Sequence, residues 1–289
     1  MHRLRHVMVA CAIGLAAPII PTSTFAGGGS PPAGGGSYGG AIVSVDHSSP
    51  AGHTFSFFDY FPRQTTVHTG DTVTFAMAPN PSEVHTITLL PENTPLSATA
   101  LGKLFPPSVG NPAPDPNAKG SLQVDFNPDV HAGCGTSLYY QGTGPCNYTG
   151  KSVVNSGLIL ASPPSPAGQA SHQPIFSIRM NTAPGTYRYF CLVHGPIMSG
   201  TIRVVAPGSH LPSTASLQAQ ATGQYQSGAA NALNYEAHLP SITTSQGGHT
   251  VFHVRSGDLY GKVALNEFIP RVVNAKAGVC LSYPSHTRG

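Results

Sequence analysis

The chain has 289 residues, and only 9% of them are charged, against about 25% in an average soluble domain. Its formal net charge of +3 arises without any run of Lys or Arg, which argues against a nucleic-acid-binding protein. The 33 Gly and 28 Pro residues favour short strands joined by turns and loops over long helices.

The N-terminus has the organisation of a secretory signal. Arg3 and Arg5 give a basic start, residues 7–20 are apolar, and Thr24-Phe25-Ala26 places small residues where a signal peptidase cuts. The apolar stretch is shorter than the roughly 20 residues of a membrane-spanning helix, and no later segment is long and apolar enough. We expect residues 1–26 to be a cleaved signal peptide, with an uncleaved anchor or a buried helix as alternatives. The mature protein is then exported to the periplasm, the cell envelope or the medium, without a transmembrane segment.

The middle of the chain predicts an all-β domain. Residues 27–40 form a Gly/Pro-rich tether, and residues 41–206 contain short segments in which apolar and polar residues alternate. Many short strands with few helix signals predict a Greek-key β-sandwich, interrupted by a long loop-rich insertion at 91–174 whose role stays open. The expected strands are Ala41–Val45, Thr54–Phe61, Thr72–Ala76, Thr86–Leu90, Leu122–Phe126, Leu138–Tyr140, Leu158–Leu160, Ile175–Met180, Thr186–Cys191 and Gly200–Val205.

The C-terminal part contains a weak internal repeat. Residues 207–235 are rich in Ala, Gln, Ser and Gly, and we interpret them as a linker. The segment from Phe61-Pro62-Arg63 to Gly70 aligns with the segment from Ile269-Pro270-Arg271 to Gly278. Because the match weakens after Gly278, residues 236–289 are expected to be a partial second copy of the domain, with chance similarity as the alternative. Such a fragment would expose a strand edge over 268–283 or pair with another chain.

The segment YRYFCLVHGPIMSGTI at 187–202 carries the strongest functional signal. Cys191 ends a predicted strand, and the following loop can return His194 and Met198 to the same end of the sandwich. His85 precedes a separate alternating run and can reach that end from a neighbouring strand. One thiolate, two imidazoles and one thioether form the ligand set of a mononuclear copper site.

These segments resemble a known family. GTYRYFCLVHGPIMSGTIRVV, together with the upstream TGDTVTF…EVHTITL, resembles the ligand regions of the cupredoxins, the plastocyanin-like and azurin-like small blue copper proteins. The resemblance covers about Ala41 to Val205. It implies one type 1 copper, with His85, Cys191 and His194 as equatorial ligands and Met198 as the axial ligand. The spacing of His194 and Met198 matches azurin, whereas the 105 residues between His85 and Cys191 exceed those of a minimal cupredoxin.

The remaining cysteines and histidines have simpler interpretations. Cys134 and Cys146 lie 12 positions apart in a Gly-rich loop, and export makes a disulfide between them possible, so we expect them to pair. Cys280 is left without an assignment. A lone strand cysteine is more often a core residue than a ligand, and zinc is the nearest chemical rival of copper. The other histidines are expected to be solvated or locally bonded, among them His47, His53, His68 and His131.

Three classes of function follow. The favoured one is an electron carrier in which the ring edge of His194 is the exit for electrons. Leu192, Pro196 and Ile197 would form its docking face for a transient redox protein. A copper storage, delivery or structural envelope module would use the same ligands. The third class is a fragment of a multidomain copper oxidoreductase, but Phe190 and Leu192 flank the cysteine where such enzymes carry histidines. We therefore expect no enzyme activity from this chain alone.

Overall fold

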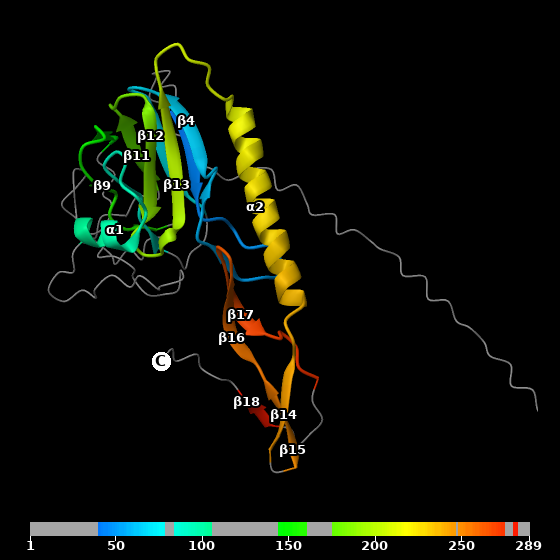
Figure 1. Cartoon of the computed structure of the whole chain (residues 1–289). Helices are drawn as coiled ribbons and strands as arrows, with labels where there is room; N and C mark the ends of the chain where they lie inside the picture. Colours follow the sequence, from blue (N-terminus) through cyan, green and yellow to red (C-terminus); the bar gives the residue numbers. More distant parts are fainter. Residues whose placement is uncertain are drawn as a thin grey trace, which may run out of the picture. The chain divides into compact units, whose positions relative to one another are not determined.

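β-Strands make up most of the regular structure of this protein. The computed structural model describes residues 40–78, 84–105, 144–160, 175–246, 248–274 and 280–282, which contain two helices (Figure 1). All of these residues belong to one compact unit, residues 38–289. The predicted signal peptide, residues 27–39 of the tether, Cys134 and the strands expected at 122–126 and 138–140 lie outside the described residues, whereas Gly40 belongs to β1.

Two five-stranded sheets form the main domain. The first has the order β3-β1-β5-β11-β8, and its strands are β1 (Gly40–Val45), β3 (Tyr60–Phe61), β5 (Thr72–Met77), β8 (Cys146–Tyr148) and β11 (Ile175–Met180). The second has the order β4-β13-β12-β7-β9, and its strands are β4 (Gln64–His68), β7 (Thr88–Leu89), β9 (Val154–Asn155), β12 (Gly185–Cys191) and β13 (Gly195–Val205). The short strands β6 (Val84–His85) and β10 (Ile159–Leu160) pair with each other.

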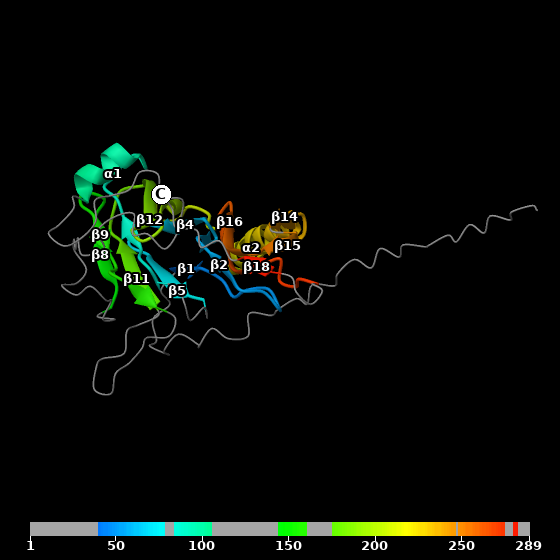
Figure 2. The same ribbon diagram turned by 90° about the horizontal axis from the view of Figure 1, so that it is seen from below.

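The two sheets lie face to face in Figures 1 and 2, and side chains from both form one hydrophobic core. Burial alternates along the strands, for example along β1 and β11, because successive side chains point to opposite faces. Aromatic rings from both sheets meet in the middle. Tyr189 of β12 makes edge contacts with Tyr60 and Phe75 at centroid distances of 4.8 and 5.0 Å. The prediction of an all-β sandwich is confirmed.

A second apolar cluster lies on the opposite side of β12. Helix α1 (Ala98–Leu104) is capped by the Ser97 side chain, which accepts a hydrogen bond from the Ala100 N–H. Its residue Leu101 packs with Phe190 and Leu192, and all three side chains are fully buried. The sequence analysis did not predict this helix, which is short and lies within the predicted insertion.

The segment interpreted as a linker forms a helix. Helix α2 (Thr214–Ala237) begins at the cap Ser213, and its alanines favour helix formation. It packs on the chain through buried alanines, and Tyr225 stacks on His47 with ring centroids 3.4 Å apart. Neither this helix nor α1 combines the length and the apolar character needed to cross a membrane.

The C-terminal strands form two small sheets, one of which includes a strand from the N-terminal part of the chain. β14 (Ile242–Gln246), β15 (His249–His253) and β18 (Cys280–Ser282) form one small sheet. β16 (Arg255–Tyr260), β17 (Val263–Ile269) and β2 (Phe55–Phe57) form another, in the order β16-β17-β2. β17 is the central strand of this sheet, but β2 pairs only with its residues 263–265, and the Phe268 side chain is 58% exposed. The expected exposed edge over 268–283 therefore stays a prediction.

The described strands agree with the proposed repeat in one respect. β15 and β18 pair in parallel, and they lie 208 residues after β1 and β5, which also pair in parallel. The division into a complete and a partial domain remains a prediction.

Candidate metal centre

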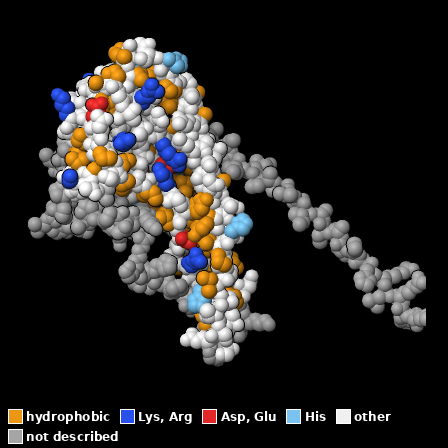
Figure 3. Space-filling view, viewed as in Figure 1, with side chains coloured by type: hydrophobic (Ala, Val, Ile, Leu, Met, Phe, Trp, Pro, Cys, Tyr) orange, Lys and Arg blue, Asp and Glu red, His pale blue; other side chains and the backbone are white. Residues whose placement is uncertain are grey.

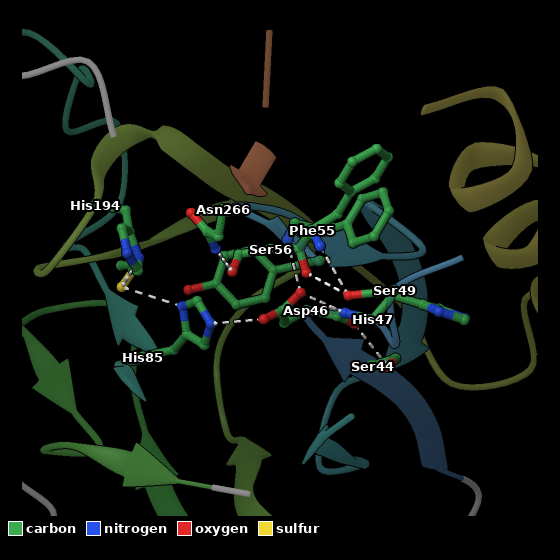
Figure 4. A network of polar contacts seen from close by, with 12 residues as sticks. Ser44, Asp46, His47, Ser49, Phe55, Ser56, His85, His194 and Asn266 are labelled. Carbon is green, nitrogen blue, oxygen red and sulfur yellow. Dashed lines mark hydrogen bonds and ion pairs between the residues drawn. The ribbon is translucent and has the colours of Figure 1, made fainter. Parts of the chain in front are cut away.

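Three of the predicted ligands meet at one end of the sandwich (Figure 4). Cys191 ends β12, and His194 lies in the turn to β13, where Gly195 has a φ of 67° and pairs with Cys191. His85 ends β6, which pairs with β10. The ligand atoms of His85, Cys191 and His194 all lie within 4.8 Å of one another. The strand-end geometry expected from the sequence is therefore present.

The spacing of these atoms fits a trigonal metal site. Sγ of Cys191 lies 3.6 Å from Nδ1 of His194 and 4.0 Å from Nδ1 of His85. Metal–sulfur and metal–nitrogen bonds of about 2.3 and 2.05 Å at an angle of 120° place the two ligand atoms about 3.8 Å apart. The two measured distances lie on either side of that value. Because the three side chains are at most 2% exposed, the site is also shielded from water.

Thr86 holds the sulfur and the loop in place. Its backbone N–H donates to Sγ of Cys191 at 3.3 Å, and its hydroxyl accepts a hydrogen bond from the Leu192 N–H at 2.7 Å. A second hydroxyl, that of Thr88, lies 3.2 Å from the first. An N–H donor stabilises a thiolate, and such hydrogen bonds tune the potential of a sulfur-ligated metal. Thr86 therefore supports the ligand atom directly.

Asp46 orients His85 from the side opposite the sulfur (Figure 4). Its Oδ2 lies 3.4 Å from Nε2 of His85, and both side chains are fully buried. Its Oδ1 accepts hydrogen bonds from the backbone N–H groups of His47 and Phe57, at 2.6 and 2.8 Å. A carboxylate that receives Nε2–H leaves Nδ1 as the nitrogen available to a metal. The sequence analysis missed Asp46, which only ends an alternating strand.

Burial and mutual contact set the charges of the ligands. Burial alone would raise the pKa of the Cys191 thiol, but hydrogen bonds and charge from His194 and His85 lower that pKa well below its usual value. Burial would likewise lower the pKa of His85, but Asp46 and Cys191 raise it to about 10. The metal-free site therefore favours a thiolate beside a protonated imidazole, and the thiolate is the form that binds metals.

His194, the predicted exit for electrons, is buried rather than exposed at the surface. Its ring is 2% exposed and stacks on Phe58, with centroids 4.2 Å apart and planes at 20°. Leu192, which we expected on the docking face, is fully buried beside α1, so that part of the prediction is wrong. Pro196 and Ile197 are half-buried.

The fourth predicted ligand and the predicted disulfide stay predictions. Met198 lies on β13, is fully buried and belongs to the same core cluster as Cys191. Cys191 carries a free thiol. Gly200, which follows Met198 in the recognised motif, has a packing role, because a Cβ there would collide with the Tyr189 ring and approach the Arg63 carbonyl to 2.8 Å. Cys146 begins β8, but Cys134 lies outside the described residues.

Comparisons with known proteins give distant structural matches. No protein-family model matches the chain, and no curated protein matches it. An amicyanin variant in its reduced Cu(I) form is 14% identical, with a TM-score of 0.26 over 58% of this chain and 83% of that one. The oxidised plastocyanin of Dryopteris crassirhizoma is 18% identical, with a TM-score of 0.26 over 57% of this chain and all (100%) of that one. At such low TM-scores we take the fold and the site from the geometry of the chain itself.

Proposed function

We propose that this chain is an exported type 1 blue copper protein of the cupredoxin family, which carries single electrons between redox partners. The observation that supports the proposal is the convergence of one buried thiolate and two buried imidazole nitrogens at trigonal spacing. Soft sulfur favours Cu(I) and imidazole accommodates Cu(II). In the proposal, Met198 is the weak axial ligand.

The protein contributes rigidity and shielding. Copper, when bound, would supply the one-electron Cu(I)/Cu(II) chemistry. Thr86 fixes the sulfur, Asp46 fixes the ring of His85, and Phe58 covers the ring of His194. Ligands held from three sides move little when the oxidation state changes, and a small rearrangement is what fast electron transfer requires. This is the property that the proposed electron carrier needs.

The proposed partner is a redox protein that docks transiently. The face that it would contact includes the half-buried Pro196 and Ile197 on the loop that follows His194. Electrons would leave through the His194 ring and the side chains packed on it, which include Phe58. On the face seen in Figure 3, the described Lys and Arg side chains are scattered and form no continuous basic surface. Docking through an apolar loop would then depend little on salt.

The visible spectrum of the purified protein with Cu(II) tests the proposal. An intense blue thiolate-to-copper band is expected from the wild type and should be absent from Cys191→Ser. A matched control is Ser199→Ala, which changes a residue of β13 outside the ligand set and should keep the band. A wild-type Cu(II) complex that is colourless would overturn the carrier function and favour storage or zinc binding.

A further inference from the structure

A second group of metal-ligating side chains lies outside the centre described above. His53, Glu236 and Glu267 place their ligand atoms within 4.8 Å of one another. They come from three separate elements, which are the turn before β2, the last turn of α2 and the central strand β17. Their side chains are only 21%, 11% and 9% exposed. A cluster assembled from such distant parts of the chain is a feature of the tertiary fold.

The one proton on Nδ1 of His53 cannot serve both carboxylates of this cluster. Nδ1 of His53 lies 3.1 Å from Oε2 of Glu236 and 3.2 Å from Oε1 of Glu267. One ring nitrogen has at most one proton, and the hydrogen bond is made with Glu267. Oε2 of Glu236 is buried, and in the described part of the chain its contact with Nδ1 of His53 is an ion pair without hydrogen-bond geometry. Burial and the charge of Glu267 raise the pKa of Glu236, so a proton competes with a cation for this carboxylate. A buried oxygen without a donor is costly, and a missing ion is one explanation for it.

The surrounding charges also favour a cation. Glu236 lies in the last turn of α2, where the helix dipole disfavours a negative charge and where the helix has no basic residue. Arg271 pairs with Oε2 of Glu267 at 3.3 Å and leaves Oε1 directed at His53. Two carboxylates therefore face one imidazole and one guanidinium. A divalent cation in place of the imidazole proton would contact all three ligands at once.

The distances and the access suit such an ion. Metal–nitrogen and metal–oxygen bonds of about 2.0–2.2 Å separate neighbouring ligand atoms by about 2.8–3.6 Å in octahedral or tetrahedral sites. The contacts of 3.1 and 3.2 Å fall within that range. A cavity of ≈ 500 Å³ borders His53, Glu236 and Arg271 and gives room for entry and for water ligands. An imidazole with two carboxylates favours a transition metal over Mg²⁺ or Ca²⁺, which take oxygen ligands.

We infer that His53, Glu236 and Glu267 form a second metal site, which binds a divalent transition-metal cation such as Zn²⁺. The ion fastens α2 and β17 to the turn that precedes β2. This site shares no residue with the proposed copper centre and does not depend on it.

Zinc titration of the full-length chain, stripped of metals with a chelator, tests the inference. The wild type should bind one equivalent of Zn²⁺ more than Glu236→Gln and one more than His53→Gln. Zn²⁺ should also raise the Tm of the wild type more than that of either variant, because a ligand that binds only the folded state stabilises it. All three chains keep His85, Cys191 and His194, so any zinc bound there cancels in the comparison.

The matched control is a histidine that pairs with a single carboxylate and belongs to no three-ligand cluster among the described residues. His68 lies 3.3 Å from Asp71, and His68→Gln should keep the wild-type stoichiometry. If Glu236→Gln binds as much zinc as the wild type, or if His68→Gln loses as much as Glu236→Gln, the inference is wrong.

Zinc-soaked crystals of the wild type give a test that needs no variant. An anomalous peak within about 2.2 Å of all three side chains is expected from zinc–ligand bond lengths. Peaks confined to other histidines would overturn the site.

Discussion

The buried carboxylate of Asp46 and the buried imidazole of His85 lie 3.4 Å apart, on the side of the ring away from Cys191. Asp46 is itself held by the N–H groups of His47 and Phe57, so it cannot follow a movement of the ring. Its own backbone has a φ of 61°, a region in which Asp is more readily accommodated than most residues. The carboxylate therefore fixes both the orientation of His85 and the nitrogen that faces the metal.

Replacing the charge of Asp46 should change the metal centre without removing a ligand. Asp46→Asn is expected to lower copper affinity by about 10- to 100-fold, as loss of such a partner does in other metal sites. The reduction potential should rise, because a neutral amide makes the imidazole a weaker donor to Cu(II). Competition with a chelator and a redox titration measure the two effects.

Asp59→Asn is the matched control for this change. Asp59 is almost as buried as Asp46, but its carboxylate contacts Arg63 and Lys262. Its loss should lower the free energy of unfolding and leave the potential unchanged. An equal shift of potential in both variants would show that Asp46 acts through stability alone.

Sequence alone located the candidate ligands but not the residues that hold them in place. Cys191 and His194 lie in one short motif, and the pattern of the strands around it determines where the loop returns. Asp46 is 39 residues from His85, and nothing in its local sequence distinguishes it from an ordinary residue at a strand end. Nothing in the local sequence of Phe58 reveals its contact with His194 either. Such residues become recognisable only when tertiary packing brings them beside the ligands.

Met198 should tune the copper centre without holding the metal. Met198→Gln is expected to retain copper and to lower the reduction potential, because the axial ligand is weak and an amide oxygen favours Cu(II) over Cu(I). The visible spectrum and a redox titration measure both properties. Loss of all copper from this variant would mean that Met198 is a primary ligand.

The pH dependence of the metal-free protein should show the coupled charges of His85 and Cys191. The pKa of His85 is raised from 6.5 to about 10, so its stabilising contribution is full below pH 6.5 and is lost as the pH rises toward 10. The pKa of Cys191 is lowered well below 9.0, so its contribution is full above pH 9.0 and is lost as the pH falls. Between pH 6.5 and 9.0 the two slopes oppose each other, and stability should change little.

Urea unfolding of the chelator-treated protein at several pH values measures this profile. In Cys191→Ser the opposing slope is absent while Asp46 still raises the pKa of His85, so stability should fall steadily from pH 6.5 upward. A wild-type profile that falls in the same way would contradict the coupling.

Helix α2 illustrates why the sequence analysis did not predict a helix in the segment interpreted as a linker. Its 24 residues include Gly223 and Gly228 among Ala, Gln and Ser, a composition that also suits a flexible connection. Its buried face is made of small alanines, so the apolar periodicity of an amphipathic helix is weak. The helix is specified largely by what it packs against, including the stacking of Tyr225 on His47.

The C-terminal segment should stabilise the sandwich. β17 pairs with β2 and shares a core cluster with Phe55, Phe57 and Phe61, each at most 3% exposed. A chain ended at Leu239 lacks β17 and uncovers part of these rings, at a cost of up to about 3 kcal/mol for each side chain fully uncovered. Its Tm should be clearly lower than that of the full chain. A chain ended at Asn274 keeps β16 and β17 and serves as the control, with a Tm close to that of the full chain. Equal Tm values for the two shortened chains would mean that β2 and the sandwich are stable without the C-terminal segment.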